Sequence, residues 1–342
     1  MTTHEHEIVG SIKLANTSGK LLNSDAKGWS RFPFHEANLR GKWGRNKRWD
    51  YWAILAGDLV ISGVYANVDY LGMADVWWCD VTTSVNGGRA LALPGGGGLK
   101  LPSISGQSPL SVQRKNFQLE MHDDALGNTT ITATWVERNG VSASLDAEMT
   151  LPVNHESLNV VIPWSDKRFQ FTTKHQARPS QGTLRIGEVT REFGDGNAWG
   201  VVDIGRGRWP YRTNWNWGGG AGVTAQGDTI GIQIGGKWTA GTGFTENGIL
   251  VNGRLHKIGN ELNWQYDWAQ PLKRWKVRDP GGQLDIELVP TYDKHSKTSL
   301  GVLRMETHQV FGQWNGRFVD DDGQVHAIEG FQGFAEESRS RW

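Results

Sequence analysis

Apolar and polar residues alternate with a period of two along most of this chain. The clearest example is the segment 141–151, where every second residue is apolar: Val141, Ala143, Leu145, Ala147, Met149 and Leu151. Successive side chains of a β-strand point to opposite faces, so this pattern predicts a strand with one face buried and the other in solvent. Similar alternation occurs at ITATWVE, LNVVI, RFQFTT, DTIGIQI, LNWQYDW, LDIELV and VHAIEGF. We find no long segment with amphipathic helical spacing, and FAEESRSRW at the end is a candidate for a short helix.

Turn-forming residues separate these expected strands. Asn139-Gly140, Asn252-Gly253 and Asp322-Gly323 each lie between alternating segments, as does Pro280-Gly281-Gly282. Such residues adopt the backbone conformations that tight β-hairpins require. The 45 Gly and 18 Trp residues among 342 also favour short aromatic-rich strands joined by turns and bulges. The sequence therefore predicts an all-β chain of antiparallel strands with little helix.

A weak internal repeat divides the chain into two halves. In the first half WVERNG leads into LDAEMTLP, and in the second half WKVRDPGG leads into LDIELVP. Each copy has an aromatic residue before a hairpin, followed by a strand that ends at proline. We therefore expect two consecutive antiparallel β-domains, residues 1–178 and 179–342, each closed into a barrel or a sandwich so that it leaves no exposed edge strand.

Charge and cysteine content narrow the class of protein. The 36 basic and 36 acidic side chains balance, so no field over the whole surface attracts nucleic acid, which we do not expect as a partner. The single cysteine, Cys79, excludes an internal disulfide framework and fits a reducing compartment. The opening residues MTTHEHEIVG have no signal-peptide pattern, and no run of about 18 apolar residues occurs. We therefore expect a cytoplasmic protein without a transmembrane segment, with disorder around His4 and His6.

The segment 199–222, WGVVDIGRGRWPYRTNWNWGGGAG, is rich in tryptophan. From Trp209 to Trp217 the odd positions are mostly aromatic and the even positions mostly polar, so as a strand the segment would carry two different faces. Burying one Trp side chain removes roughly 200 Å² from water, so such rings lie in a core or beneath a ligand. We take as candidate ligand-binding residues an aromatic set, Trp209, Tyr211, Trp215 and Trp217, and a polar set for a head group, Arg212, Asn214 and Asn216.

Three further residues are candidates for proton transfer. Asp203 lies just before the Trp-rich strand, while Glu246 and His256 flank the expected Asn252-Gly253 hairpin. Carboxylic acids and imidazoles suit general acid–base chemistry, and the hairpin allows a pair between Glu246 and His256. A structural hydrogen bond is the ordinary alternative for a histidine. We find no GxSxG, GxxxxGK[ST], HExxH or CxxC motif, so we expect neither a metal nor a cofactor.

Another aromatic cluster, RGKWGRNKRWDYW at 40–52, interleaves Arg and Lys with Trp and Tyr. This pattern suits single-stranded nucleic acid, an anionic group on a small ligand, or a strand whose rings pack inward while its cations stay in water. The neutral charge of the chain favours the last of these.

Four segments resemble the bacterial family known as domain of unknown function 2804. They are GWSRFPFHEANLRGKWGRNKRWDYW, DIGRGRWPYRTNWNW, ENGILVNGRLHKI and DDGQVHAIEGFQGFAEESRSRW, and the resemblance extends over nearly the whole chain. It departs at Ile204, where the family pattern has tryptophan. The family is more distantly similar to two-domain lipocalin-like proteins that include carotenoid hydratases, tocopherol cyclase and fungal Diels-Alderases. This resemblance implies two lipocalin-like β-barrels side by side and an apolar, polyunsaturated ligand.

These features are compatible with three functions. The first is a cytoplasmic protein that binds an isoprenoid- or lipid-like molecule in an aromatic-lined pocket and acts as a cofactor-free lyase, hydratase or cyclase. In that case Asp203, Glu246 and His256 transfer protons while aromatic faces stabilise a developing cation. The second is a lipid carrier or sensor that performs no chemistry. The third is a carbohydrate-recognising β-module, because Trp rings beside Asn, Asp and Arg also suit sugars. The sequence leaves these alternatives, and the oligomeric state, open.

Overall fold

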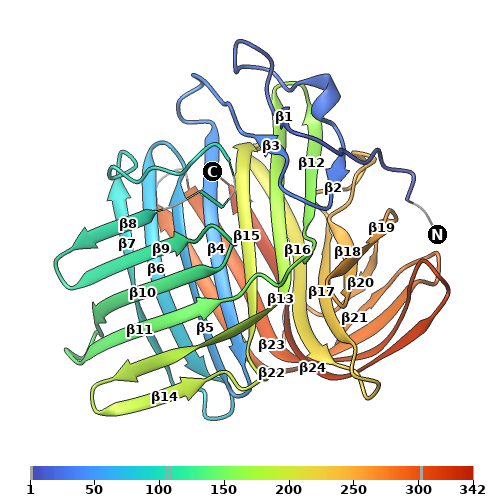
Figure 1. Ribbon diagram of the computed structural model, residues 1–342. Helices are drawn as coiled ribbons and strands as arrows, with labels where there is room; N and C mark the ends of the chain where they lie inside the picture. Colours follow the sequence, from blue (N-terminus) through green and yellow to red (C-terminus); the bar gives the residue numbers. More distant parts are fainter. Residues whose placement is uncertain (1–2, 105, 108, 301–302, 342) are drawn as a thin grey trace.

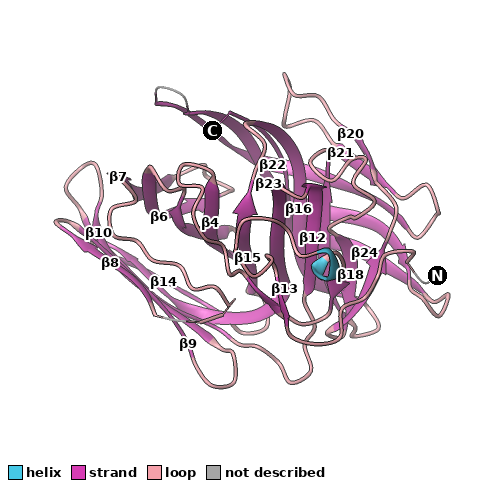
Figure 2. Cartoon of the chain, turned by 90° about the horizontal axis from the view of Figure 1, so that it is seen from above, coloured by secondary structure: helices cyan, strands magenta, loops and turns pink. Residues whose placement is uncertain are grey.

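The computed structural model describes residues 3–104, 106–107, 109–300 and 303–341, and most of them lie in β-strands (Figure 1). The only helical element within these ranges is the 3-10 turn η1 (Ser24–Ala26). Apart from β1 (Ile12–Lys13) and β3 (His35–Glu36), which pair in parallel, the strands form two large antiparallel sheets. The predicted all-β fold with little helix is confirmed, and each sheet is curled into a half-barrel (Figure 2). Across the described residues, no helix is both long and apolar enough to cross a membrane.

In the described chain, thirteen strands form the first sheet. Ten of them make a continuous ladder, in the order β7 (Asn86–Pro94), β6 (Leu71–Asp80), β5 (Leu59–Asn67), β4 (Asn46–Ala56), β15 (Trp199–Arg208), β13 (Arg168–Ile186), β11 (Ser142–Met149), β10 (Thr129–Val136), β9 (Phe117–Asp123) and β8 (Leu110–Arg114). The other three are β12 (Leu158–Ser165) and β14 (Val189–Phe193), which pair with β13, and β2 (Trp29–Ser30), which pairs with β12.

Nine strands of the described ranges form the second sheet. Their order is β19 (Arg254–Ile258), β18 (Asn247–Val251), β17 (Thr229–Gly236), β16 (Arg212–Val223), β24 (Val325–Arg341), β23 (Leu303–Val319), β22 (Leu284–Leu300), β21 (Trp275–Arg278) and β20 (Asn263–Gln265). The candidate short helix at the end of the chain is wrong as far as Arg341, because β24 pairs with β16 on one side and with β23 on the other. Its last residue, Trp342, lies outside the described residues.

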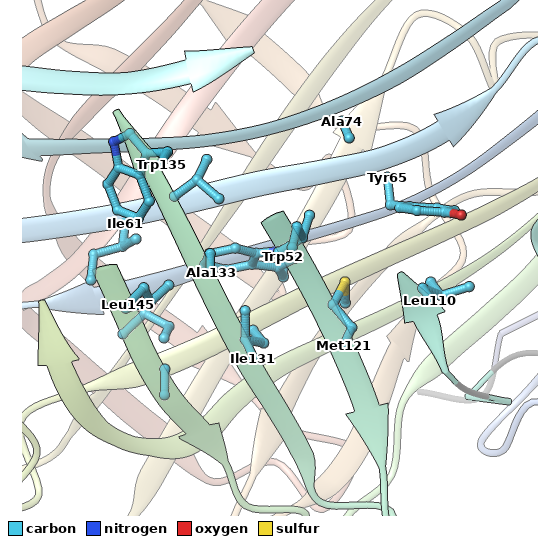
Figure 3. Packing of buried hydrophobic residues seen from close by; sticks show 14 of the residues in the cluster. Trp52, Ile61, Tyr65, Ala74, Leu110, Met121, Ile131, Ala133, Trp135 and Leu145 are labelled. Carbon is cyan, nitrogen blue, oxygen red and sulfur yellow. The ribbon is translucent and has the colours of Figure 1, made fainter. Parts of the chain in front are cut away.

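The first sheet folds over an apolar core of its own. Trp52, Ile61 and Tyr65 of β4 and β5 face Ile131 and Leu145 of β10 and β11 across this core (Figure 3). In β10 and β11 the buried residues alternate with exposed or half-buried ones, as the sequence pattern predicts. The period of two therefore sets which side of each strand enters the core.

The second sheet encloses a separate core that includes Ile232, Trp275, Trp314 and Phe318. The two copies of the internal repeat form the hairpins β10–β11 and β21–β22, one in each sheet. The division at residue 178 stays a prediction. It falls within β13, and the ladder of the first sheet continues to Arg208 because β15 pairs with both β4 and β13.

The two sheets also pack against each other face to face. Trp77 of β6 stacks on Phe311 of β23 with ring centroids 5.8 Å apart. Ala53 of the first sheet lies in one buried cluster with Trp217 and Phe334 of the second. The apolar clusters of the described residues thus include two half-barrel interiors and the layer between the sheets, which we call the inter-sheet layer (Figure 2).

Candidate functional site

Strand β16 carries the predicted aromatic and polar faces, and the structure orients them. Trp217 points into the inter-sheet layer, where its ring meets Tyr51 edge-on at 5.5 Å. Asn216 points the other way and donates a hydrogen bond to the Tyr266 hydroxyl at 3.0 Å. The aromatic face therefore looks toward the first sheet, and the polar face looks into the second half-barrel.

The expected strand from Trp209 to Trp217 is shorter than predicted. Strand β15 ends at Arg208 and β16 begins at Arg212, so Trp209, Pro210 and Tyr211 form the connection between the two sheets. Proline has no backbone N–H and so interrupts a ladder of hydrogen bonds. Of the polar candidates, Arg212 and Asn214 are exposed, as is Tyr211 at 44%.

A lysine that sequence reasoning did not select lies at the centre of the inter-sheet layer. Lys174 of β13 has its Nζ 3.1 Å from Asp203 Oδ2 and 3.3 Å from Glu246 Oε2. All three side chains are buried. The same ammonium group lies 4.3 Å from the ring centroid of Trp217. The structure thus joins two of the three predicted proton-transfer residues through one cation, and places an indole face beside it.

Each carboxylate of this cluster has further donors. Asp203 Oδ1 accepts a hydrogen bond from the Thr172 hydroxyl at 3.1 Å, and its Oδ2 accepts one from Trp49 Nε1 at 3.1 Å. Glu246 Oε1 accepts one from Trp238 Nε1. Gly235 makes room for Glu246, because a Cβ at that position would overlap the carboxylate. Asp203 is therefore held from the first sheet and Glu246 from the second.

A third carboxyl lies in the same layer. Glu336 of β24 accepts a hydrogen bond from Trp215 Nε1 at 2.7 Å. Lys294 of β22 is half-buried here, with its Nζ 3.1 Å from Ser62 Oγ and 4.1 Å from the ring centroid of Trp77. Lys174 and Lys294 both lie close enough to Glu336 to influence its ionisation.

Burial controls the protonation of these carboxyls. Removal from water raises the pKa of Glu246 to about 7, although Lys174 and the Trp238 hydrogen bond act against the rise. Burial likewise raises the pKa of Glu336 to about 7, opposed by Trp215, Lys174 and Lys294. For Lys174 burial disfavours the charge, but the carboxylates of Asp203 and Glu246 outweigh it and raise its pKa. Near neutral pH this layer therefore holds carboxyl groups poised between the acid and the carboxylate.

A group of indole rings covers the cluster on one side. Trp209 stacks on Trp238 with centroids 5.1 Å apart and planes 10° apart, and it contacts Trp49, Trp164 and Trp215 edge-on or tilted. Trp209 and Trp238 are buried, whereas Trp49, Trp164 and Trp215 are half-buried and reach the surface. We call these five residues the indole group.

His256 lies apart from this cluster. In β19 its Nδ1 is 3.1 Å from Asp321 Oδ2, and its ring packs edge-on against Phe318 inside the second half-barrel. The register of the β18–β19 hairpin sets Ile249 opposite His256. Glu246 precedes β18, where it forms an ion pair with Lys174 and accepts a hydrogen bond from Trp238. The expected pair between Glu246 and His256 is therefore not formed.

Three hollows of the surface, of about 640, 620 and 390 Å³, are lined by none of the candidate site residues. In the described residues, no group of three or more His, Cys, Asp or Glu side chains is arranged to hold a metal ion.

Lys174 and Glu336 could not be selected from the sequence. Lys174 sits in the alternating stretch RFQFTTKHQ, where a lysine reads as a solvent-facing residue. Glu336 sits in the segment that suggested a short helix. Both become site residues only because the sheets pack face to face, which buries strand faces that would otherwise meet water.

Comparison with known proteins identifies the family. The family model described as "Domain of unknown function (DUF2804)" matches residues 5–342, so the chain belongs to this family and the resemblance seen in the sequence is confirmed. Among curated proteins, none matches this chain.

Several solved structures are similar in shape. Kievitone hydratase from Nectria haematococca shares 10% identity over 97% of this chain and 96% of its own, with a TM-score of 0.46. CghA shares 9% identity over 98% of this chain and 94% of its own, with a TM-score of 0.45. A candidate AttH from Nitrosomonas europaea shares 10% identity over 86% of this chain and 92% of its own, with a TM-score of 0.49. These similarities carry no activity or ligand over to this chain.

Proposed function

We propose that this member of the DUF2804 family catalyses a cofactor-free acid–base reaction, of the lyase, hydratase or cyclase type, on a largely apolar small molecule in the inter-sheet layer. The observation that carries the proposal is the Lys174 ammonium group between Asp203 and Glu246, at 3.1 and 3.3 Å. A catalytic acid needs a pKa near the working pH, and burial raises the pKa of Glu246 to about 7.

The residues suggest a division of roles. Glu246 in its acid form donates a proton to a carbon–carbon double bond, so that a new C–H bond forms from the π electrons and a cation develops on the neighbouring carbon. Indole faces stabilise such a cation, and Lys174 stabilises the carboxylate that Glu246 leaves behind. Asp203 then accepts a proton, either from a water molecule that adds to the cation or from an adjacent carbon. Proton transfer back to Glu246 restores the starting state.

The surroundings favour an apolar substrate. The half-buried rings of Trp49, Trp164 and Trp215 form the surface boundary of the cluster, and Phe244 packs against the same group. A ligand would reach the cluster by displacing these half-buried side chains. A simple carrier needs no proton donor, so the raised pKa of Glu246 favours catalysis over carriage. Trp209 and Trp217 are buried, which disfavours their use as open platforms for sugars.

We place this activity in the cytoplasm. Cys79 is the only cysteine of the sequence, and it is buried and unpaired. A chain without disulfides is suited to a reducing compartment.

Deuterium transfer tests the proposal directly. The protein is incubated in D₂O with geranylgeraniol and with oleic acid as probes, and mass spectrometry measures carbon-bound deuterium in the recovered lipid. Binding is followed separately by quenching of Trp fluorescence. We expect incorporation from at least one probe, with a loss of about 100-fold or more in Glu246→Gln. Glu120→Gln is the matched control, because Glu120 is an exposed carboxylate of β9.

Three results would overturn parts of the proposal. Binding without incorporation would mark the protein as a carrier. Incorporation that is equal in wild type and in Glu246→Gln would remove Glu246 as the acid. Failure of both probes to quench Trp fluorescence would argue against an apolar ligand.

A further inference from the structure

The segment Thr3–Ile8 is built into the fold beside the proposed site. The sequence suggested disorder here, but the side chain of Glu5 is fully buried. The backbone of Ile8 donates to Trp29 O at 2.7 Å, and Trp29 donates to His6 O at 2.9 Å, so the segment runs alongside β2. Trp29 Nε1 also donates to Glu5 O at 3.2 Å. The expectation of disorder is therefore wrong for residues 3–8.

The Glu5 carboxylate reaches a buried cation of the second sheet and a backbone amide just before β18. Its Oε1 lies 2.7 Å from Lys257 Nζ in β19. The same oxygen accepts hydrogen bonds from the backbone N–H of Thr245 at 3.1 Å and from its hydroxyl at 2.8 Å. Lys257 Nζ in turn donates to Thr245 Oγ1 at 2.6 Å. Glu5 and Lys257 thus hold Thr245 by both its backbone and its side chain.

Thr245 directly precedes Glu246 in the chain. Fixing the amide and the hydroxyl of Thr245 restricts the peptide unit that carries Glu246, and so restricts where its carboxyl can lie. Lys257 is also close enough to Glu246 for that carboxylate to influence its ionisation. The contact therefore restricts the position of Glu246 and also places a charge near its carboxyl.

Two glycines allow this segment to lie so close. A Cβ at Gly28 would come within 2.6 Å of His6 O, and a Cβ at Gly259 would overlap the Thr3 hydroxyl. Neither glycine needs a positive φ, so close approach is the reason for the small residue. The absence of a side chain at Gly28 and Gly259 thus makes room for both ends of the segment.

We infer that Glu5 and Lys257 are positioning residues that fix the Glu246 carboxyl through Thr245. The relevance of this role for catalysis rests on the proposed function, whereas the coupling itself does not. A buried ion pair is a weak source of stability compared with apolar side chains of similar volume. The Glu5–Lys257 ion pair next to the proposed acid is therefore better explained by the orientation of Glu246 than by stability.

Carboxyl titration by ¹³C NMR tests the coupling without any substrate. Protein labelled in its Glu side chains is titrated, and the Glu246 signal is assigned by its loss in Glu246→Gln. In Glu5→Gln a negative neighbour is lost and the Lys257 charge is no longer paired, so both changes favour the Glu246 carboxylate. We expect the pKa of Glu246 to fall by about half a unit or more, with Glu336 unchanged. Glu5→Asp should recover part of the shift.

Glu7→Gln is the matched control, because Glu7 lies in the same segment but is partly exposed and pairs with Arg31. It should leave Glu246 unchanged. If Glu5→Gln does not fold, Lys257→Met takes its place: it removes a positive neighbour and leaves the Glu5 charge unpaired, so the pKa of Glu246 should rise by about half a unit or more. An unshifted Glu246 titration in a folded variant overturns the inference. A shifted titration in a protein that transfers no deuterium upholds the coupling between Glu5 and Glu246 and rejects the proposed function.

Discussion

The Lys174 ammonium group lies 4.3 Å from the ring centroid of Trp217, and these two residues come from different sheets. The contact places a buried cation of the first sheet against the aromatic face of the second. A buried charge needs compensation, and Asp203 and Glu246 provide it at 3.1 and 3.3 Å. The inter-sheet layer therefore contains buried charges of opposite sign that compensate each other, in addition to its apolar contacts.

Removal of the central cation should destabilise the protein strongly at neutral pH. Lys174→Met leaves Asp203 and Glu246 buried without their partner, and we expect a loss of about 3–5 kcal/mol in the free energy of unfolding at pH 8. The loss should be smaller at pH 5, where Glu246 is protonated. Urea unfolding at both pH values measures it. Lys297→Met, at a lysine whose side chain is 68% exposed, should change the stability by less than about 0.5 kcal/mol. An equal loss at both pH values would contradict this electrostatic account.

Stability should also depend on pH through Glu246 and Glu336. Their folded pKa values are raised from 4.5 to about 7, so the folded protein keeps protons that the unfolded chain releases between these values. The stability from these groups is therefore greatest below pH 4.5 and is lost as pH rises through 7, by up to about 3 kcal/mol for each group. Unfolding free energies from pH 4.5 to 8 should fall less steeply in Glu246→Gln/Glu336→Gln than in wild type. Parallel curves would show that neither carboxyl holds a proton in this range.

The hydrogen bond from Trp215 to Glu336 should favour the charged carboxylate. Trp215→Phe removes the donor at 2.7 Å but keeps an aromatic ring. We expect the pKa of Glu336 to rise further, with a stability loss of about 1–2 kcal/mol at pH 8. ¹³C NMR titration measures the first effect and urea unfolding the second. Trp43→Phe serves as the control, because Trp43 is 73% exposed. A fall in the Glu336 pKa would mean that water replaces the lost donor.

The close approach of Gly235 to Glu246 should be needed for activity. Gly235→Ala places a methyl group against the carboxylate, so Glu246 must move and the protein should lose about 1–3 kcal/mol of stability. Deuterium transfer should fall at least tenfold in the folded variant. Gly10→Ala is the control, since a Cβ there meets nothing within 4 Å. Full transfer by Gly235→Ala would show that the position of Glu246 is not critical.

His256 should affect stability but not chemistry. It contacts Asp321 and Phe318 inside the second half-barrel, away from Lys174. We expect His256→Gln to keep deuterium transfer within about twofold of wild type while its free energy of unfolding falls by about 1–2 kcal/mol. A loss of transfer comparable to that of Glu246→Gln would bring His256 back as a proton-transfer residue.

The local pattern of the sequence was enough for several of the strands and for the turns between them. The period-two alternation marks β11, and Asn252-Gly253 marks the β18–β19 turn, where both residues have positive φ. Side-chain alternation and turn conformation each depend on a few consecutive residues, so they can be predicted without knowledge of distant parts of the chain. FAEESRSRW shows the limit of that reasoning, since pairing with β16 and β23 makes it a strand up to Arg341.

The antiparallel strand content and the two-sided character of the Trp-rich strand follow from the sequence alone, which also makes Asp203 and Glu246 candidate acids. The packing of the two sheets is what turns the aromatic side of that strand toward the other sheet, puts Lys174 between the two carboxyls and keeps His256 away from them. The physical reason is that alternation reports a difference between two faces, whereas the packing of distant strands decides which face is buried and which charges meet there.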